Sequence, residues 1–171
     1  MTMTTFRLEY GEAFQAAIAG LQRRFRAIQR QAADNDDKSY FKDLFATDIH
    51  GAIAEYTVAK ALGSYCNASS VDRALPDVGL DVEVRSSTDT KAPLRIRPRD
   101  AKKPNFANLK FYLVVGVYPD TRIVGWMYGK DCVQDRFWTA ASQNPFFTEK
   151  DPCWAIPQHE LKTELIEFSY E

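Results

Sequence analysis

One stretch of the chain, residues 110–118, is almost continuously apolar and places the strongest constraint on the fold. A strand with apolar side chains on both faces is stable as the centre of a sheet that is covered on both sides. Residues 122–128 form a second strand-like segment, and the Pro119-Asp120-Thr121 sequence between the two predicts a hairpin. We therefore expect an α/β (α+β) protein with a mixed sheet.

An amphipathic helix is predicted for residues 12–33, after a short strand over residues 4–10. Arginines on one face of this helix are interpreted as a solvated surface rather than as a DNA contact: Arg23, Arg24, Arg26 and Arg30. The opposite face carries an apolar stripe, in which side chains recur at steps of three and four residues: Phe14, Ile18, Leu21, Phe25 and Ile28.

A second helix is predicted for residues 48–62, ended by Gly63. Its side chains are small and apolar almost all round, which is typical of a buried helix. Glu55 is the carboxylate within it. A buried carboxylate is costly unless it meets a metal ion or a hydrogen-bond donor, so Glu55 is a candidate site residue.

The most informative stretch is residues 76–85, PDVGLDVEVR. Side chains alternate across a strand, so Asp81, Glu83 and Arg85 share one face, each about 7 Å from the next. Asp77 lies upstream of Gly79, which permits a sharp turn that would return Asp77 to the side of Glu83. The alternative is a solvated strand face with ordinary ion pairs.

These acids suit a hard divalent cation. Mg²⁺ prefers carboxylate and carbonyl oxygens and keeps several waters, and it neutralises charge on a phosphate during hydrolysis. A cation two residues after the last acid would contact that phosphate. Two distant histidines, His50 and His159, give neither a zinc pattern nor a catalytic triad.

Several short motifs resemble small phage and prokaryotic proteins of the PD-(D/E)XK nuclease type, which have the restriction endonuclease-like fold. Gly51-Ala52-Ile53-Ala54-Glu55 is similar to their "GxxxE" helix, and Asp77-Val78-Gly79 with Glu83-Val84-Arg85 is similar to the segments that follow it. Later motifs, Ile123-Val124-Gly125-Trp126 and Trp154-Ala155-Ile156-Pro157, also match the group. The resemblance covers about residues 49–161.

The resemblance implies a helix, then a three-stranded antiparallel β-meander, then a strand added in parallel. It also implies a metal-dependent nuclease acting on DNA, with Mg²⁺ (or Mn²⁺) held by Asp77 and Glu83 and assisted by Glu55. Arg85 stands where these proteins usually have lysine, and arginine stays protonated, so it cannot act as a base. Asp81 is an alternative ligand to Asp77.

The missing lysine leaves two interpretations. In one, an amine comes from elsewhere in the chain, with Lys91, Lys102 and Lys103 as candidates. In the other, the protein is a catalytically inactive module that binds nucleic acid or a protein. A structural protein whose acids bind nothing is a third alternative.

Net charge is −1, so any DNA binding requires a local cluster of basic residues. One cluster is present, and it predicts a rim that contacts phosphates: Lys91, Arg95, Arg97, Arg99, Lys102 and Lys103. The alternative is a solvated charged surface.

The whole chain, residues 1–171, is expected to be one domain, with residues 1–47 as an extension and 48–171 as the core. A short strand is predicted for residues 94–97, a helix for residues 131–141, and an irregular tail with a strand near Ile166. Three widely spaced cysteines favour free thiols in a cytoplasmic setting, and no apolar run is long enough to span a membrane. A homodimer is suggested by analogy with other nucleases.

Overall fold

The computed structural model describes residues 6–29, 44–67, 75–140 and 152–164. Its helices are α1 (Tyr10–Gln29), α2 (Leu44–Leu62) and the short α3 (Gly129–Cys132). The strands are β1 (Val82–Ser87), β2 (Leu94–Ile96), β3 (Lys110–Val115), β4 (Arg122–Tyr128), β5 (Trp138–Thr139) and β6 (Cys153–Ile156). Short 3-10 turns lie at Asp100–Lys102, Phe106–Asn108, Asp135–Phe137 and Gln158–Glu160. The chain is therefore a mixed α/β protein, as expected.

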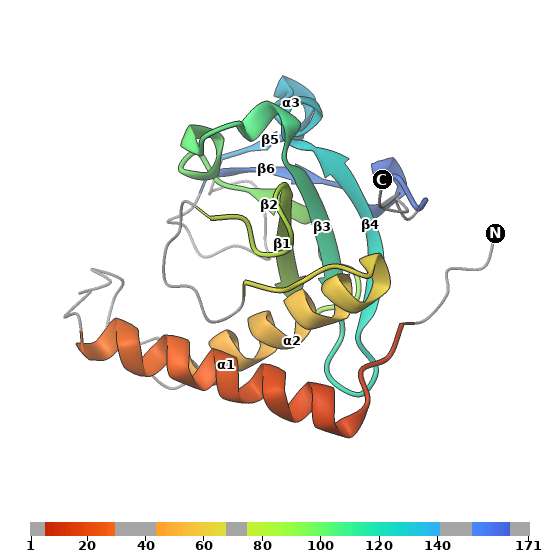
Figure 1. Cartoon of the computed structure of the whole chain (residues 1–171). Coiled ribbons are helices and arrows are strands. Elements are labelled where there is room, and N and C mark those ends of the chain that lie inside the picture. The colour runs from red at the N-terminus through yellow and green to blue at the C-terminus, as the bar shows by residue number, and fades with distance from the viewer. Residues whose placement is uncertain (1–5, 30–43, 68–74, 141–151, 165–171) are drawn as a thin grey trace.

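The first sheet has the order β1-β3-β4 (Figure 1). Strand β3 is buried along its whole length and lies at the centre, as its apolar sequence predicts. It pairs with β4 in the expected antiparallel hairpin and with β1 in parallel, where Val84 lies opposite Tyr112.

The expected three-stranded antiparallel meander is wrong. Strand β2 leaves the first sheet and joins a second, antiparallel sheet of order β2-β6-β5, in which Leu94 lies opposite Ile156. The physical reason is the position of β3. Because β3 is apolar on both faces, it takes the centre of the first sheet beside β1, and the chain between β1 and β3 passes through the second sheet as β2. Segment 153–156, expected to be irregular, is the middle strand of this second sheet.

Each face of the first sheet is covered by a different layer. Helix α2 packs on one face, where Ala54 and Val58 meet Val82 and Val84. The second sheet covers the other face, where Leu94 packs with Phe111 in one apolar cluster. Val82 and Val84 of β1 thus face α2, and the side chains that alternate with them point to the opposite face of the sheet.

Helix α1 lies outside α2, and its orientation contradicts the sequence interpretation (Figure 1). Its apolar stripe faces solvent: Phe14 is 57% exposed and Phe25 53%. The buried side consists of small residues, Ala13, Ala16, Ala19 and Gly20, which allow α1 to lie against the backbone of α2. A Cβ on Gly20 would lie 2.5 Å from the Asp48 carbonyl oxygen, so the close approach of the two helices explains the reversal.

Other boundaries also differ from expectation. The described residues 6–9 form no strand, and the predicted helix at 131–141 is replaced by α3, a 3-10 turn and β5. The predicted strand near Ile166, the C-terminal end of the first predicted helix and Arg30 lie outside the described residues. No helix in the described part of the chain has the length and apolar character needed to cross a bilayer.

Candidate functional site

The candidate site lies along the free edge of β1, which pairs with β3 alone among the described strands. The backbone N–H of Val84 points to this edge and donates to Asp77 Oδ2 at 2.8 Å. Gly79, with a φ of 57°, forms the turn that returns Asp77 to the strand. The structure thus brings Asp77 beside Glu83 in the way the sequence predicts.

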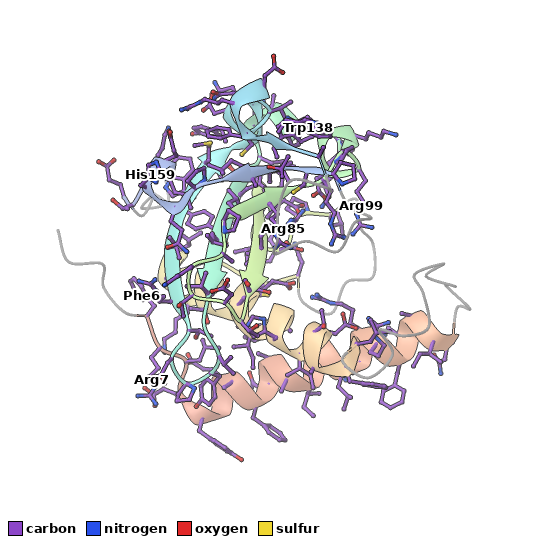
Figure 2. The ribbon with its side chains drawn as sticks, turned by 180° about the vertical axis from the view of Figure 1, so that it is seen from behind. Phe6, Arg7, Arg85, Arg99, Trp138 and His159 are labelled. Carbon is purple, nitrogen blue, oxygen red and sulfur yellow. The ribbon has the colours of Figure 1, made fainter. Side chains whose placement is uncertain are left out.

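Arg85 reaches back along the same edge, and one of its nitrogens lies among three oxygens. Its Nη1 atom is 3.0 Å from the Val84 carbonyl oxygen, 3.4 Å from Glu83 Oε2 and 3.8 Å from Asp77 Oδ2. The other nitrogen, Nη2, lies 3.0 Å from Asp100 Oδ1. Figure 2 shows Arg85 on the flank of β1. A single positive charge therefore gathers two carboxylates and a carbonyl from the strand edge.

Lys103 contacts the second oxygen of Glu83. Its Nζ atom donates to Glu83 Oε1, and the Glu83 side chain is only 1% exposed, so both of its oxygens have basic partners. Of the three candidate lysines, Lys103 is at the site, whereas Lys91 and Lys102 are exposed.

Glu55 approaches the site from α2 and is held by the N-terminal helix. Arg23 of α1 donates to both carboxylate oxygens of Glu55, at 2.9 and 2.7 Å. Burial raises the pKa of Glu55 to about 7, Arg23 opposes the rise, and the charges of Asp77 and Glu83 add to it. The direct partner of Glu55 is thus Arg23, and the charges of Asp77 and Glu83 act on it in addition.

Burial also raises the pKa of Glu83, with the Asp77 charge adding to the rise, while Arg85 and Lys103 oppose it. Burial lowers the pKa of Arg85, but the surrounding carboxylates, Asp100 first, raise it by more, and the guanidinium stays charged. The site therefore combines three buried acids, Glu55, Glu83 and Asp100, with the partly exposed Asp77, and the protein's own cations neutralise them.

Asp81, the alternative ligand, lies with a different partner. Its Oδ2 atom accepts from Lys110 Nζ at 2.8 Å, whereas Arg85 pairs with Asp77, Glu83 and Asp100. Asp77 is therefore the acid that the structure places at the strand edge.

Part of the predicted basic rim borders the site. The segment from Arg97 to Lys103 supplies Asp100 and Lys103 to Arg85 and Glu83, and Arg99 lies on the same flank of the molecule as Arg85 (Figure 2). Arg99 and Lys102 are exposed. Arg95 lies apart, on β2 opposite Ala155, and Lys91 lies in the turn that precedes β2.

Sequence reasoning missed two residues of this site. Arg23 was assigned to a solvated face, because its helix was expected to bury the opposite side. Asp100 lies inside the predicted basic cluster and was not among the candidate site residues. The sequence could have indicated Asp100, since an acid within a basic cluster is a natural partner for an arginine such as Arg85. It could not have indicated Arg23, because the role of Arg23 depends on how α1 packs against α2.

The oxygen set at Arg85 Nη1 has the chemistry that a hard divalent ion requires. In the described residues, however, no three His, Cys, Asp or Glu side chains converge as a metal site, and the acids instead pair with Arg23, Arg85 and Lys103. Comparison with known proteins gave no match: no family model, curated protein or solved structure is significantly similar to this chain.

Proposed function

We propose that this protein is a divalent-metal-dependent nuclease that hydrolyses phosphodiester bonds in DNA. The observation that carries the proposal is the position of Arg85 Nη1, a cationic atom surrounded by oxygens of Asp77, Glu83 and Val84. A site that gathers oxygens around one positive charge is suited to a divalent cation in the same place.

Asp77 and Glu83 would hold Mg²⁺ or Mn²⁺ together with the Val84 carbonyl, and Glu55 would assist from α2. The ion would supply positive charge to the phosphate as the bond breaks. These oxygens fit such an ion, because two are carboxylate oxygens and the third is a strand carbonyl.

The chain's own cations would then act on the substrate. Lys103, beside Glu83, replaces the lysine that Arg85 displaces from the motif, and its amine would orient the attacking water. Arg85 would turn from the carboxylates to a phosphate oxygen, since its guanidinium remains charged. Arg99 and Lys102 would contact neighbouring phosphates along the exposed segment.

The test is cleavage of plasmid, linear and single-stranded DNA with Mg²⁺ or Mn²⁺. Glu83→Gln should reduce the rate about 100-fold or more, as expected when one preorganised electrostatic contact is lost. Asp81→Asn is the matched control, because Asp81 is an acid nearby that pairs with Lys110 instead. Cleavage that Glu83→Gln leaves unchanged would overturn the assignment.

One observation favours a second candidate, a catalytically inactive module that binds nucleic acid or a protein. Arg85 already neutralises the strand-edge oxygens and can serve as a permanent substitute for a metal ion. In that case the wild type binds DNA without Mn²⁺ and does not cut it. Arg85→Lys, which shortens the side chain and withdraws its charge from the strand-edge oxygens, would then create Mn²⁺ binding measurable by calorimetry.

The three cysteines are free thiols, two of them buried, which fits the reducing cytoplasm in which we place this activity.

A further inference from the structure

The outer face of α1 carries an apolar stripe that stays largely exposed, although Phe25, near its C-terminal end, also contacts the ring of Phe45 in α2. Tyr10 is 77% exposed, Phe14 57%, Ile18 39%, Phe25 53% and Ile28 49%. Figure 2 shows side chains projecting from the side of α1 that faces away from the sheets. Isolated exposed apolar residues are common, but a contiguous stripe of this size is typical of an interaction site.

The spacing of the stripe is that of a helix-pairing seam. From Phe14 onward the steps are four, three, four and three, through Ile18, Leu21, Phe25 and Ile28. This alternation is the a/d repeat of a coiled coil, narrower than the face with which a helix covers a protein core. The opposite face of α1, made of small residues, is already packed on α2. We call the outer residues the α1 seam.

Uncharged residues flank the α1 seam on one side. The positions next to it are Gln15, Gln22 and Gln29, all exposed. Two copies of this helix can therefore approach along the seam without setting like charges beside each other on that side. A seam that recognised a charged partner helix would be expected to carry charges at these positions.

Charge along the axis selects the orientation. Glu9, just before α1, and Arg26, in its last turn, are exposed, whereas Glu12 and Arg24 pair with Lys60 and Asp48 of α2. Parallel packing would bring the arginines of two copies together, whereas antiparallel packing brings each acidic end beside a basic end. In that arrangement Phe14 meets Phe25 of the partner subunit.

The exposed area is sufficient for a modest interface. The exposed fractions of the seam correspond to about 550 Å² per copy, taking roughly 200 Å² for a large side chain. Two copies would bury about 1,100 Å² from the seam alone, the range of weak specific complexes, and the glutamines would add to it.

We propose that the α1 seam is a homodimer interface, formed by two copies of α1 packed antiparallel about a two-fold axis. The interface lies on the side of α1 opposite the face that packs on α2, so the dimer carries two separate sites.

Sedimentation equilibrium over a range of protein concentrations tests the proposal. Ile18→Glu places two buried charges near the axis and should weaken the dimer about 100-fold. Val133→Glu is the matched control, because Val133 is 38% exposed, like Ile18, and follows α3 at the far end of the molecule from α1 (Figure 1). Circular dichroism checks that both variants are folded.

A wild-type protein that stays monomeric at its highest soluble concentration would overturn the proposal. So would a dimer that Ile18→Glu leaves intact, or a monomer that binds anionic vesicles through the seam. Orientation is tested with a spin label at Gln29→Cys in a Cys66→Ser background, where the antiparallel pair predicts a separation of roughly 30 Å. A much shorter separation would overturn the antiparallel arrangement.

Discussion

Arg23 holds the Glu55 carboxylate through both of its oxygens, at 2.9 and 2.7 Å, across a gap of 32 residues in the chain. The contact ties the N-terminal helix to the candidate site on α2 and β1. Glu55 is 5% exposed, so this guanidinium is the group that makes a charged carboxylate tolerable there.

We predict that Arg23→Ala lowers the free energy of unfolding by about 3 kcal/mol, because it leaves a buried carboxylate without its partner. Urea denaturation measures the change. Arg136→Ala is the matched control: Arg136 also contacts both oxygens of a glutamate, Glu160, but at the surface, so the expected loss is below about 1 kcal/mol. Equal losses in the two variants would contradict the buried role of Arg23.

A second prediction concerns pH. The pKa of Glu55 is about 7 in the folded protein against 4.5 as its ordinary value, so between these pH values the folded state binds a proton that the unfolded state lacks. Stability therefore falls as pH rises from 4.5 to 7, by about 3 kcal/mol from this group. Glu83 adds a change of the same sign.

Glu55→Gln should remove the contribution of Glu55 to this pH dependence, so that the free energy of unfolding changes less between pH 4.5 and 7. Urea denaturation at several pH values across this window compares the two slopes. A slope that is the same in the variant and the wild type would show that Glu55 titrates at the same pKa folded and unfolded.

The strand edge could be predicted from the sequence because its geometry is local. Alternation along β1 places Glu83 and Arg85 on one side, and Gly79 permits the turn that returns Asp77, so a few neighbouring residues determine three site positions. The apolar sequence of β3 likewise predicts a central strand, since no other position covers both of its faces.

The orientation of α1 and the partner of β2 could not be predicted in this way, because each depends on contacts distant in sequence. The apolar stripe of α1 predicts that this stripe is the buried face. The structure instead buries the face made of small residues, because these allow the close approach to α2 at Gly20. That prediction also placed Arg23 in solvent. The pairing of Leu94 with Ile156 depends on a strand 62 residues away, which no local pattern reveals.

We further predict that Lys103→Ala destabilises the protein by about 2 kcal/mol and abolishes any DNA cleavage. The Glu83 carboxylate would lose a charge-assisted hydrogen bond in a place that water does not reach. Thermal denaturation and a cleavage assay measure the two effects. Lys102→Ala, at the exposed neighbouring residue, should change stability by less than about 0.5 kcal/mol. A Lys103→Ala protein that cuts DNA at the wild-type rate would exclude Lys103 as the catalytic amine.

The final prediction concerns the close packing of α1 on α2. A glycine-to-alanine substitution should destabilise the protein in α1 and stabilise it in α2. Gly20→Ala should cost about 1–3 kcal/mol, because its Cβ would lie 2.5 Å from the Asp48 carbonyl oxygen and the helices would have to separate. Gly51→Ala, within α2, meets nothing within 4 Å and should stabilise the protein by about 1 kcal/mol through helix propensity. Urea denaturation of both variants gives the two signs directly.

Because separating the helices would also loosen Arg23 from Glu55, a further Arg23→Ala substitution should lower the free energy of unfolding by less in the Gly20→Ala variant than in the wild type. Additive losses in the double variant would show that the helix contact and the ion pair stabilise the fold independently.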